Sequence, residues 1–101
     1  MLLHTVTFES TLTEAQVIAV ARGRKPAYEA VPGLVQKYYV KHGEPNTYSG
    51  VMLWESAEAL AAFRETELAR TVGDAFGVKG APRVQIGENM FSLREGGIAA
   101  A

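Results

Sequence analysis

Residues with apolar or β-branched side chains gather in four short segments, and two longer stretches between them carry apolar residues every three or four positions. The short segments are typical of strands and cover Leu2–Phe8, Leu34–Val40, Tyr48–Trp54 and Arg83–Leu93. The helical spacing begins after Thr13 in the first long stretch and after Ser56 in the second. The order β-α-β-β-α-β predicts an α+β fold of the ferredoxin-like class, in which helices cover one face of a four-stranded antiparallel sheet.

Local signals mark where the helices begin and end. Thr13 and Gln16 have the spacing of a capping box, and Ser56 is placed to cap the second helix. Pro26 disfavours helical geometry at the residue before it, so we expect the first helix to end or kink there. The basic run Arg22–Lys25 then lies at the helix end, where cations complement the macrodipole.

The chain is expected to form one domain. Val31–Gly33 has the composition of a turn, and His42–Asn46 that of a hairpin tip. The 101 residues suffice for one core, and no linker, repeat or low-complexity segment divides them. We therefore predict a single domain over residues 1–95, followed by a flexible tail over residues 96–101.

The strands are apolar on both of their faces, which predicts a partner subunit. An antiparallel sheet with one face in water alternates apolar and polar residues. The segments Val51–Trp54, Leu34–Val35 and Tyr38–Val40 do not alternate in this way. Since the chain has no spare element to cover the second face, we predict a homodimer in which two such sheets close an α/β barrel.

Composition and charge argue against several classes of protein. Ten basic and eleven acidic residues give a formal net charge of −1, whereas nucleic-acid binders usually carry a basic excess. There is no cysteine, and no apolar run approaches the roughly 20 residues that span a bilayer. The first residues also lack the pattern of a secretory signal. We expect a cytoplasmic protein without nucleic-acid or membrane partners.

Motifs of the common cofactor and nucleophile sites are absent. The sequence contains no nucleophile elbow, phosphate-binding loop or dinucleotide fingerprint. His4 and His42 lie far apart and lack the neighbouring carboxylates of a metal site. We therefore expect neither a metal nor a cofactor, and we expect His42, in its hairpin, to be solvated.

His4 and Trp54 are the candidates for chemistry. Trp54 ends a strand directly before a helix cap, and His4 lies in the first strand, which is the neighbour of the third in this topology. The two side chains can therefore project together into an apolar, aromatic-walled pocket that binds a small hydrophobic or aromatic molecule. The alternative is that both are packing residues of the core, as a lone histidine among apolar neighbours often is.

Part of the sequence resembles a known superfamily. Pro32-Gly33-Leu34 with Lys37, and Ser49 to Ser56 followed by Phe63, are similar to the dimeric α/β-barrel superfamily that includes the antibiotic-biosynthesis monooxygenases. The likeness covers residues 30–91 and is greatest to the YdhR-type monooxygenases. Members include oxygenases that use neither metal nor flavin, haem-degrading enzymes, and proteins without an established reaction.

The residues of the haem-degrading members match only in part. Those enzymes use an asparagine in the first strand, a tryptophan at the end of the third, and a histidine on the next helix as the iron ligand. Trp54 matches the tryptophan, His4 stands at the asparagine position, and Gly73 falls at the histidine position. The resemblance therefore implies a protein without haem.

The resemblance implies a cofactor-independent monooxygenase that acts on a small phenolic compound, which supplies the electrons for O2 itself. In this hypothesis His4 is the base, and Trp54 is a hydrogen-bond donor and part of the pocket wall. Lys37 and Tyr39 flank the substrate if the hairpin register turns them inward, and Phe63 and Phe76 add to the apolar wall. A non-catalytic small-molecule carrier and a purely structural dimer remain the alternatives.

Overall fold

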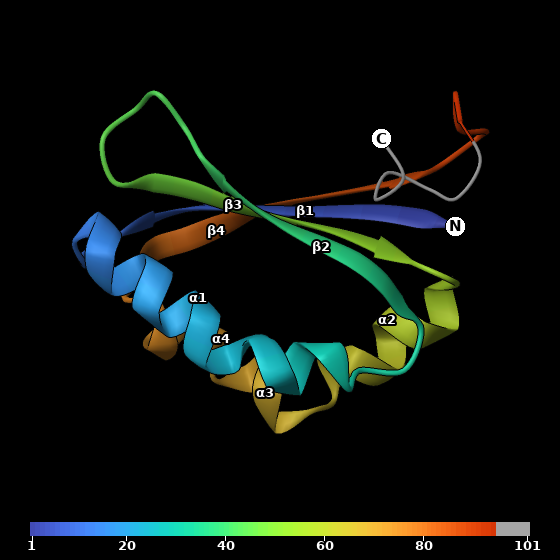
Figure 1. Ribbon diagram of the computed structural model, residues 1–101, viewed down its shortest axis with the longest axis horizontal. Coiled ribbons are helices and arrows are strands. Elements are labelled where there is room, and N and C mark those ends of the chain that lie inside the picture. Colours follow the sequence, from blue (N-terminus) through green and yellow to red (C-terminus); the bar gives the residue numbers. More distant parts are fainter. Residues whose placement is uncertain (95–101) are drawn as a thin grey trace.

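The computed structural model describes residues 1–94 of the chain (Figure 1). Its elements are, in order, β1 (Leu2–Ser10), α1 (Glu14–Glu29), β2 (Leu34–Lys41), β3 (Thr47–Trp54), α2 (Ala57–Arg64), α3 (Glu67–Arg70), α4 (Val72–Ala75) and β4 (Val78–Glu88). The strands form one antiparallel sheet in the order β2-β3-β1-β4, which confirms the predicted ferredoxin-like fold. The predicted domain limit at residue 95 and the tail over residues 96–101 lie outside the described residues.

The helices form a second layer on one face of the sheet (Figure 1). Two clusters of buried side chains lie between the layers. One consists of Tyr28, Met52, Trp54, Leu60 and Phe63, and the other of Val17, Ala21, Tyr48 and Phe76. None of the helices in residues 1–94 combines the length and the apolar character that a membrane crossing requires.

α1 begins as predicted and ends later than predicted. The capping box is formed: Gln16 N–H donates to Thr13 Oγ1 over 3.2 Å, and Thr13 N–H donates to Gln16 Oε1 over 2.9 Å. Of the two outcomes expected at Pro26, an end or a kink, the end is wrong, because the helix continues to Glu29. Pro26 lies in the last turn, where its ring removes a single backbone hydrogen bond, and the buried side chain of Tyr28 holds this turn against the core.

The basic run Arg22–Lys25 therefore lies inside α1, and its predicted place at the helix end is also wrong. Arg24 instead reaches across to α3. Its guanidinium donates to the carbonyl oxygen of Leu68 over 2.7 Å and to Thr71 Oγ1 over 3.1 Å. Arg24 thus satisfies a carbonyl group that the short helix α3 leaves without an internal partner.

The second helical stretch consists of three short helices. Ser56 caps α2 as predicted, because its Oγ accepts the N–H of Ala59 over 3.1 Å. The hydroxyl of Thr66 donates to the carbonyl oxygen of Phe63 over 2.6 Å and accepts the N–H of Ala69 over 3.2 Å. Thr66 therefore ends α2 and begins α3, and the chain turns directly after Arg64.

β4 is shifted toward the N-terminus relative to the predicted Arg83–Leu93. It begins at Val78 and includes Pro82, which an edge strand tolerates because one of its sides has no strand to bond. It ends at Glu88, which pairs with Leu2, the first residue of β1. Residues 89–93 have no further β1 residues to pair with, so the strand stops.

The sheet face that points away from the helices is mixed in character. Cross-strand pairs place Leu3, Val51, Leu53, Tyr38 and Val40 on it together with Thr5, Thr7, Ser49, Arg83 and Gln85. The expectation of a mainly apolar second face therefore holds for β2 and β3 and fails for β1 and β4. The homodimer stays a prediction.

Candidate functional site

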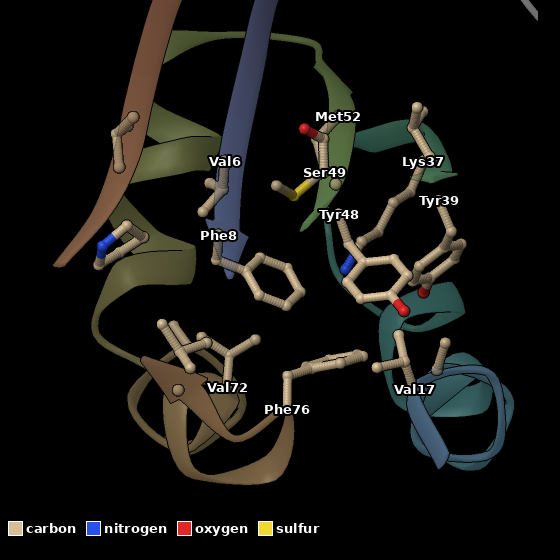
Figure 2. Close-up of a pocket in the computed structure, with 18 of the residues that line it drawn as sticks. Val6, Phe8, Val17, Lys37, Tyr39, Tyr48, Ser49, Met52, Val72 and Phe76 are labelled. Carbon is tan, nitrogen blue, oxygen red and sulfur yellow. The ribbon is translucent and has the colours of Figure 1, made fainter. Parts of the chain in front are cut away.

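A cavity of about 630 Å³ lies between the helix-facing side of the sheet and the helices (Figure 2). Such a volume is within the usual range for small-molecule sites. Its walls are mostly apolar and aromatic, and include Val6, Phe8, Val17, Tyr28, Tyr39, Tyr48, Met52, Phe63, Val72 and Phe76. Phe8 lies at the centre of one aromatic group, with its ring centroid 6.1 Å from that of Tyr48 and 5.7 Å from that of Phe76.

The strand register aligns two polar residues at one end of this cavity. His4 pairs with Met52, and Met52 pairs with Lys37, so the three side chains form one row across β1, β3 and β2. Neighbouring strands are ~4.8 Å apart, so His4 and Lys37 leave the sheet roughly 10 Å from each other, on either side of Met52. The row of Phe8 and Tyr48 lies four residues along β1, roughly 13 Å away.

His4 is buried and bonded to Trp54. The indole N–H of Trp54 donates to Nδ1 of His4 over 3.3 Å. Since an indole nitrogen only donates, Nδ1 must carry a lone pair, and the proton of the neutral imidazole lies on Nε2. Burial lowers the pKa of His4, and the charges of Arg64 and Lys37 lower it further. His4 therefore presents an N–H donor and stays neutral at neutral pH.

Lys37 is an amine among aromatic rings. Its Nζ lies 3.4 Å from the centroid of the Tyr28 ring and 4.7 Å from that of Tyr39. The ring faces favour the ammonium form. Burial acts against it, and so does the charge of Arg24, and the pKa of Lys37 is lowered to about 7. At neutral pH a large part of Lys37 is therefore a free amine, which can accept a proton.

The polar end of the cavity carries positive charge without carboxylates to balance it. Arg64, at the end of α2, lines the cavity with His4 and Lys37. Within residues 1–94, neither Arg64 nor Lys37 forms an ion pair, and the neighbouring Glu65 pairs with Arg70 over 3.6 Å. The cavity thus has a cationic end and an aromatic end.

The structure brings five of the six predicted site residues to the cavity: His4, Lys37, Tyr39, Phe63 and Phe76. The register also decides between Tyr38 and Tyr39, because Tyr38 pairs with Val51 on the opposite face. Trp54 is fully buried behind His4, with its ring centroid 5.2 Å from that of Phe63, and it is not part of the cavity wall.

Sequence reasoning missed other lining residues. Tyr28 lies beside Lys37, but its helical spacing in the sequence indicates only a position in the core. Arg64 follows Phe63 directly in the sequence, and this adjacency to a predicted wall residue was the one feature that could have indicated its place in the cavity. Phe8 and Tyr48 lie four residues along their strands from His4 and Met52, on the same face of the sheet. Strand periodicity alone could therefore have predicted that they line the cavity.

His42 lies on the other face of the sheet. It is exposed, as expected, and its Nε2 lies 2.6 Å from Ser49 Oγ, which in turn lies 2.7 Å from Thr7 Oγ1. These residues line a separate depression of about 360 Å³. In the part of the chain that the structure describes, no three histidine, aspartate or glutamate side chains are grouped as they would be to hold a metal ion.

No protein-family model matches the chain, and no curated protein does. Solved structures match it over most of its length. SnoaB, a cofactor-independent oxygenase from Streptomyces nogalater, matches with a TM-score of 0.76 and 14% identity over 93% of this chain and 97% of that one. A Caulobacter crescentus protein assigned to the antibiotic biosynthesis monooxygenases matches with a TM-score of 0.76 and 18% identity, over 89% of this chain and 90% of that one.

A third structure, a protein of unknown function from Nitrosomonas europaea, has the same TM-score of 0.76 and 18% identity, over 90% of each chain. At such identities the likeness concerns the fold alone. The order of elements, the four-stranded antiparallel sheet and its helical layer thus all correspond to those of these proteins. The chain therefore has the fold of the antibiotic biosynthesis monooxygenases.

Proposed function

We propose that the chain is a cofactor-independent monooxygenase that oxidises a small phenolic compound in the cavity between sheet and helices. The observation that supports this most is the place of Lys37, an amine with a pKa of about 7 beside two aromatic rings. A base with a pKa near the working pH is what the ionisation of a phenol needs. The likeness of the fold to SnoaB is in keeping with this chemistry.

In this mechanism Lys37 takes the part of the base that the sequence analysis gave to His4. The indole N–H of Trp54 occupies the lone pair on Nδ1 of His4, and Nε2 already holds a proton. His4 is better suited to donate a hydrogen bond to an oxygen anion than to accept a proton. Trp54 acts through His4 and is a positioning residue.

The substrate lies across Met52, with its phenolic oxygen at Lys37 and the reacting O2 on the side of His4. The free amine of Lys37 accepts the phenol proton. The phenolate passes one electron to O2, and the resulting phenoxyl radical and superoxide combine at a ring carbon that carries hydrogen. The Nε2–H of His4 stabilises the charge on the oxygen.

Lys37 then returns its proton to the peroxide, and water leaves with the hydrogen of the same ring carbon. A quinone remains. One atom of O2 is in the product and the other in water, and the substrate has supplied all four electrons. No external reductant or cofactor is needed for this balance.

The test is O2 consumption with a panel of phenols and naphthols, together with the appearance of the quinone absorbance. We expect turnover by the wild type and a loss of about 100-fold or more in Lys37→Met, which removes the base. Since the free amine is the active form, kcat/KM should rise with pH up to about 7 and level off above it. This break should be absent from the residual activity of the variant.

A wild-type protein that binds phenols but consumes no O2 would refute the oxygenase and leave the alternative of a small-molecule carrier. If Lys37→Met retains the break in the pH profile, a group other than Lys37 is the base. The likeness to the YdhR-type enzymes in particular and the cytoplasmic location stay predictions.

A further inference from the structure

We propose that the natural substrate is a hydroxylated aromatic acid whose carboxylate binds Arg64 at the cationic end of the cavity. This inference rests on the proposed function, since it places the phenolic group of the same substrate at Lys37. The inference adds that the substrate is an anion and that Arg64 selects it over a neutral compound.

The charges around the cavity carry the first part of the argument. Two other cations, Lys41 and Lys79, have carboxylate partners: Lys41 pairs with Glu14 over 2.9 Å, and Lys79 with Glu9 over 3.6 Å. Arg64 and Lys37 have no such partner within residues 1–94. Arg64 follows Phe63, whose ring centroid lies 5.2 Å from that of Trp54, the hydrogen-bond partner of His4, so Arg64 belongs to the His4 end of the cavity. A neutral ligand would leave this group of cations unbalanced.

The division of labour between the two cations follows from their chemistry. The active form of Lys37 is the free amine, which becomes an ammonium when it accepts the phenol proton, and the phenolate then balances that charge. Arg64 remains charged at all working pH values, because a guanidinium does not lose its proton in proteins. Its planar fork suits a carboxylate, which it can bind through two parallel hydrogen bonds.

The other end of the cavity suits an extended ring system. Phe8 and Tyr48 lie roughly 13 Å along the sheet from the row of His4 and Lys37. Phe76 packs against Phe8 with ring centroids 5.7 Å apart, and the three rings face the interior (Figure 2). The carboxylates that line the cavity, Glu14 and Asp74, come from the start of α1 and from α4. Glu14 is paired with Lys41, which also lines the cavity, so within residues 1–94 that end offers a second acidic group no unpaired cation. The substrate should therefore carry its carboxylate at the Arg64 end only.

The experiment compares two probes of nearly equal shape, 3-hydroxy-2-naphthoate and 3-hydroxy-2-naphthamide, by calorimetric titration of the full chain in the absence of O2. Both probes carry their hydroxyl and their acid or amide group at the same end of the ring system. We expect the wild type to bind the acid about tenfold or more tightly than the amide, since one charge-assisted contact has about that value. Arg64→Gln should abolish the preference while the amide binds as before, and Arg64→Lys should restore part of it.

Arg70→Gln is the matched control, because Arg70 is also an exposed helical arginine but does not line the cavity. It should keep the preference for the acid. Equal affinity of the wild type for the two probes, binding of neither, or a preference that survives in Arg64→Gln would overturn the inference. Because binding is measured without O2 turnover, failure of the oxygenase proposal would leave this result intact. Turnover of neutral phenols alone would support the oxygenase and contradict the preference for an acid.

Discussion

The bond between Trp54 and His4 determines what the histidine can do. A donor aimed at Nδ1 excludes a proton from that nitrogen and so opposes the charged imidazolium. This effect adds to burial and to the nearby charges, which lower the pKa of His4 in the same direction. One buried hydrogen bond thus makes a hydrogen-bond donor of a residue that is often a base.

Trp54→Phe tests this arrangement. The variant loses the N–H donor and leaves space in the core, so the free energy of unfolding should fall by about 2 kcal/mol. The pKa of His4 should rise, because a proton on Nδ1 no longer faces the indole N–H. Urea unfolding gives the first quantity, and titration of the imidazole signals by NMR gives the second.

Leu60→Ala is the control for this prediction. Leu60 belongs to the same core cluster, and its truncation should cost about 2–3 kcal/mol without removing a donor to His4. The pKa of His4 should then stay as in the wild type. A pKa that is unchanged in Trp54→Phe, or that rises equally in both variants, would contradict the positioning role of Trp54.

At the scale of elements, the turn before β2 is held against α2 by a glycine. Gly33 has a φ of 79°, and its carbonyl oxygen accepts the N–H of Glu55 over 2.8 Å. A Cβ at Gly33 would lie 2.4 Å from the Cβ of Ala59 in α2. This turn sets where β2 begins, and the shift of register between Leu34 and Gln36 then brings Lys37 and Tyr39 to the cavity.

Gly33→Ala should lower the free energy of unfolding by about 3 kcal/mol, because strain in the left-handed region adds to the clash with α2. Gly23→Ala should instead raise it by about 0.5–1 kcal/mol. Gly23 lies inside α1, with nothing within 4 Å of an added Cβ, and alanine has the higher helix propensity. Urea unfolding of both variants decides, and equal stabilities would show that the turn is not packed in this way.

At the scale of the whole molecule, apolar surface remains on β4 and after it. Val84 and Ile86 face the helical layer, where no helix covers them, and are 48% and 47% exposed. Met90, Phe91 and Leu93 follow the strand and are 87%, 79% and 85% exposed. On the opposite, outer face Tyr38 and Val40 are 36% and 37% exposed and lie beside Val51. We expect the sheet of a second copy to cover this outer face.

We therefore predict that the protein sediments near twice its monomer mass of 10.9 kDa. Tyr38→Glu should shift it to the monomer at micromolar concentration, because a charge on the outer face would be buried without a partner. Ala62→Glu places the same charge on an exposed position of α2 and should leave the dimer intact. A wild type that is monomeric, or a Tyr38→Glu variant that stays dimeric, would refute this interface.

The sequence by itself determined the order of the strands and helical stretches, the caps at Thr13 and Ser56, and Phe63 and Phe76 in the cavity wall. These follow from periodicity and local hydrogen bonding, which act over a few residues. The end of α1 could not be predicted, because the burial of Tyr28 outweighs the local effect of Pro26.

The chemistry of the site was decided by tertiary structure. The sequence marked His4, Trp54 and Lys37 as polar groups of one pocket, but their roles depend on contacts between strands and helices. The indole of Trp54, 50 positions from His4, fixes the tautomer of the imidazole. Burial and the charge of Arg24 lower the pKa of Lys37. Such effects arise from distances in space and from desolvation, which no pattern of neighbouring residues contains.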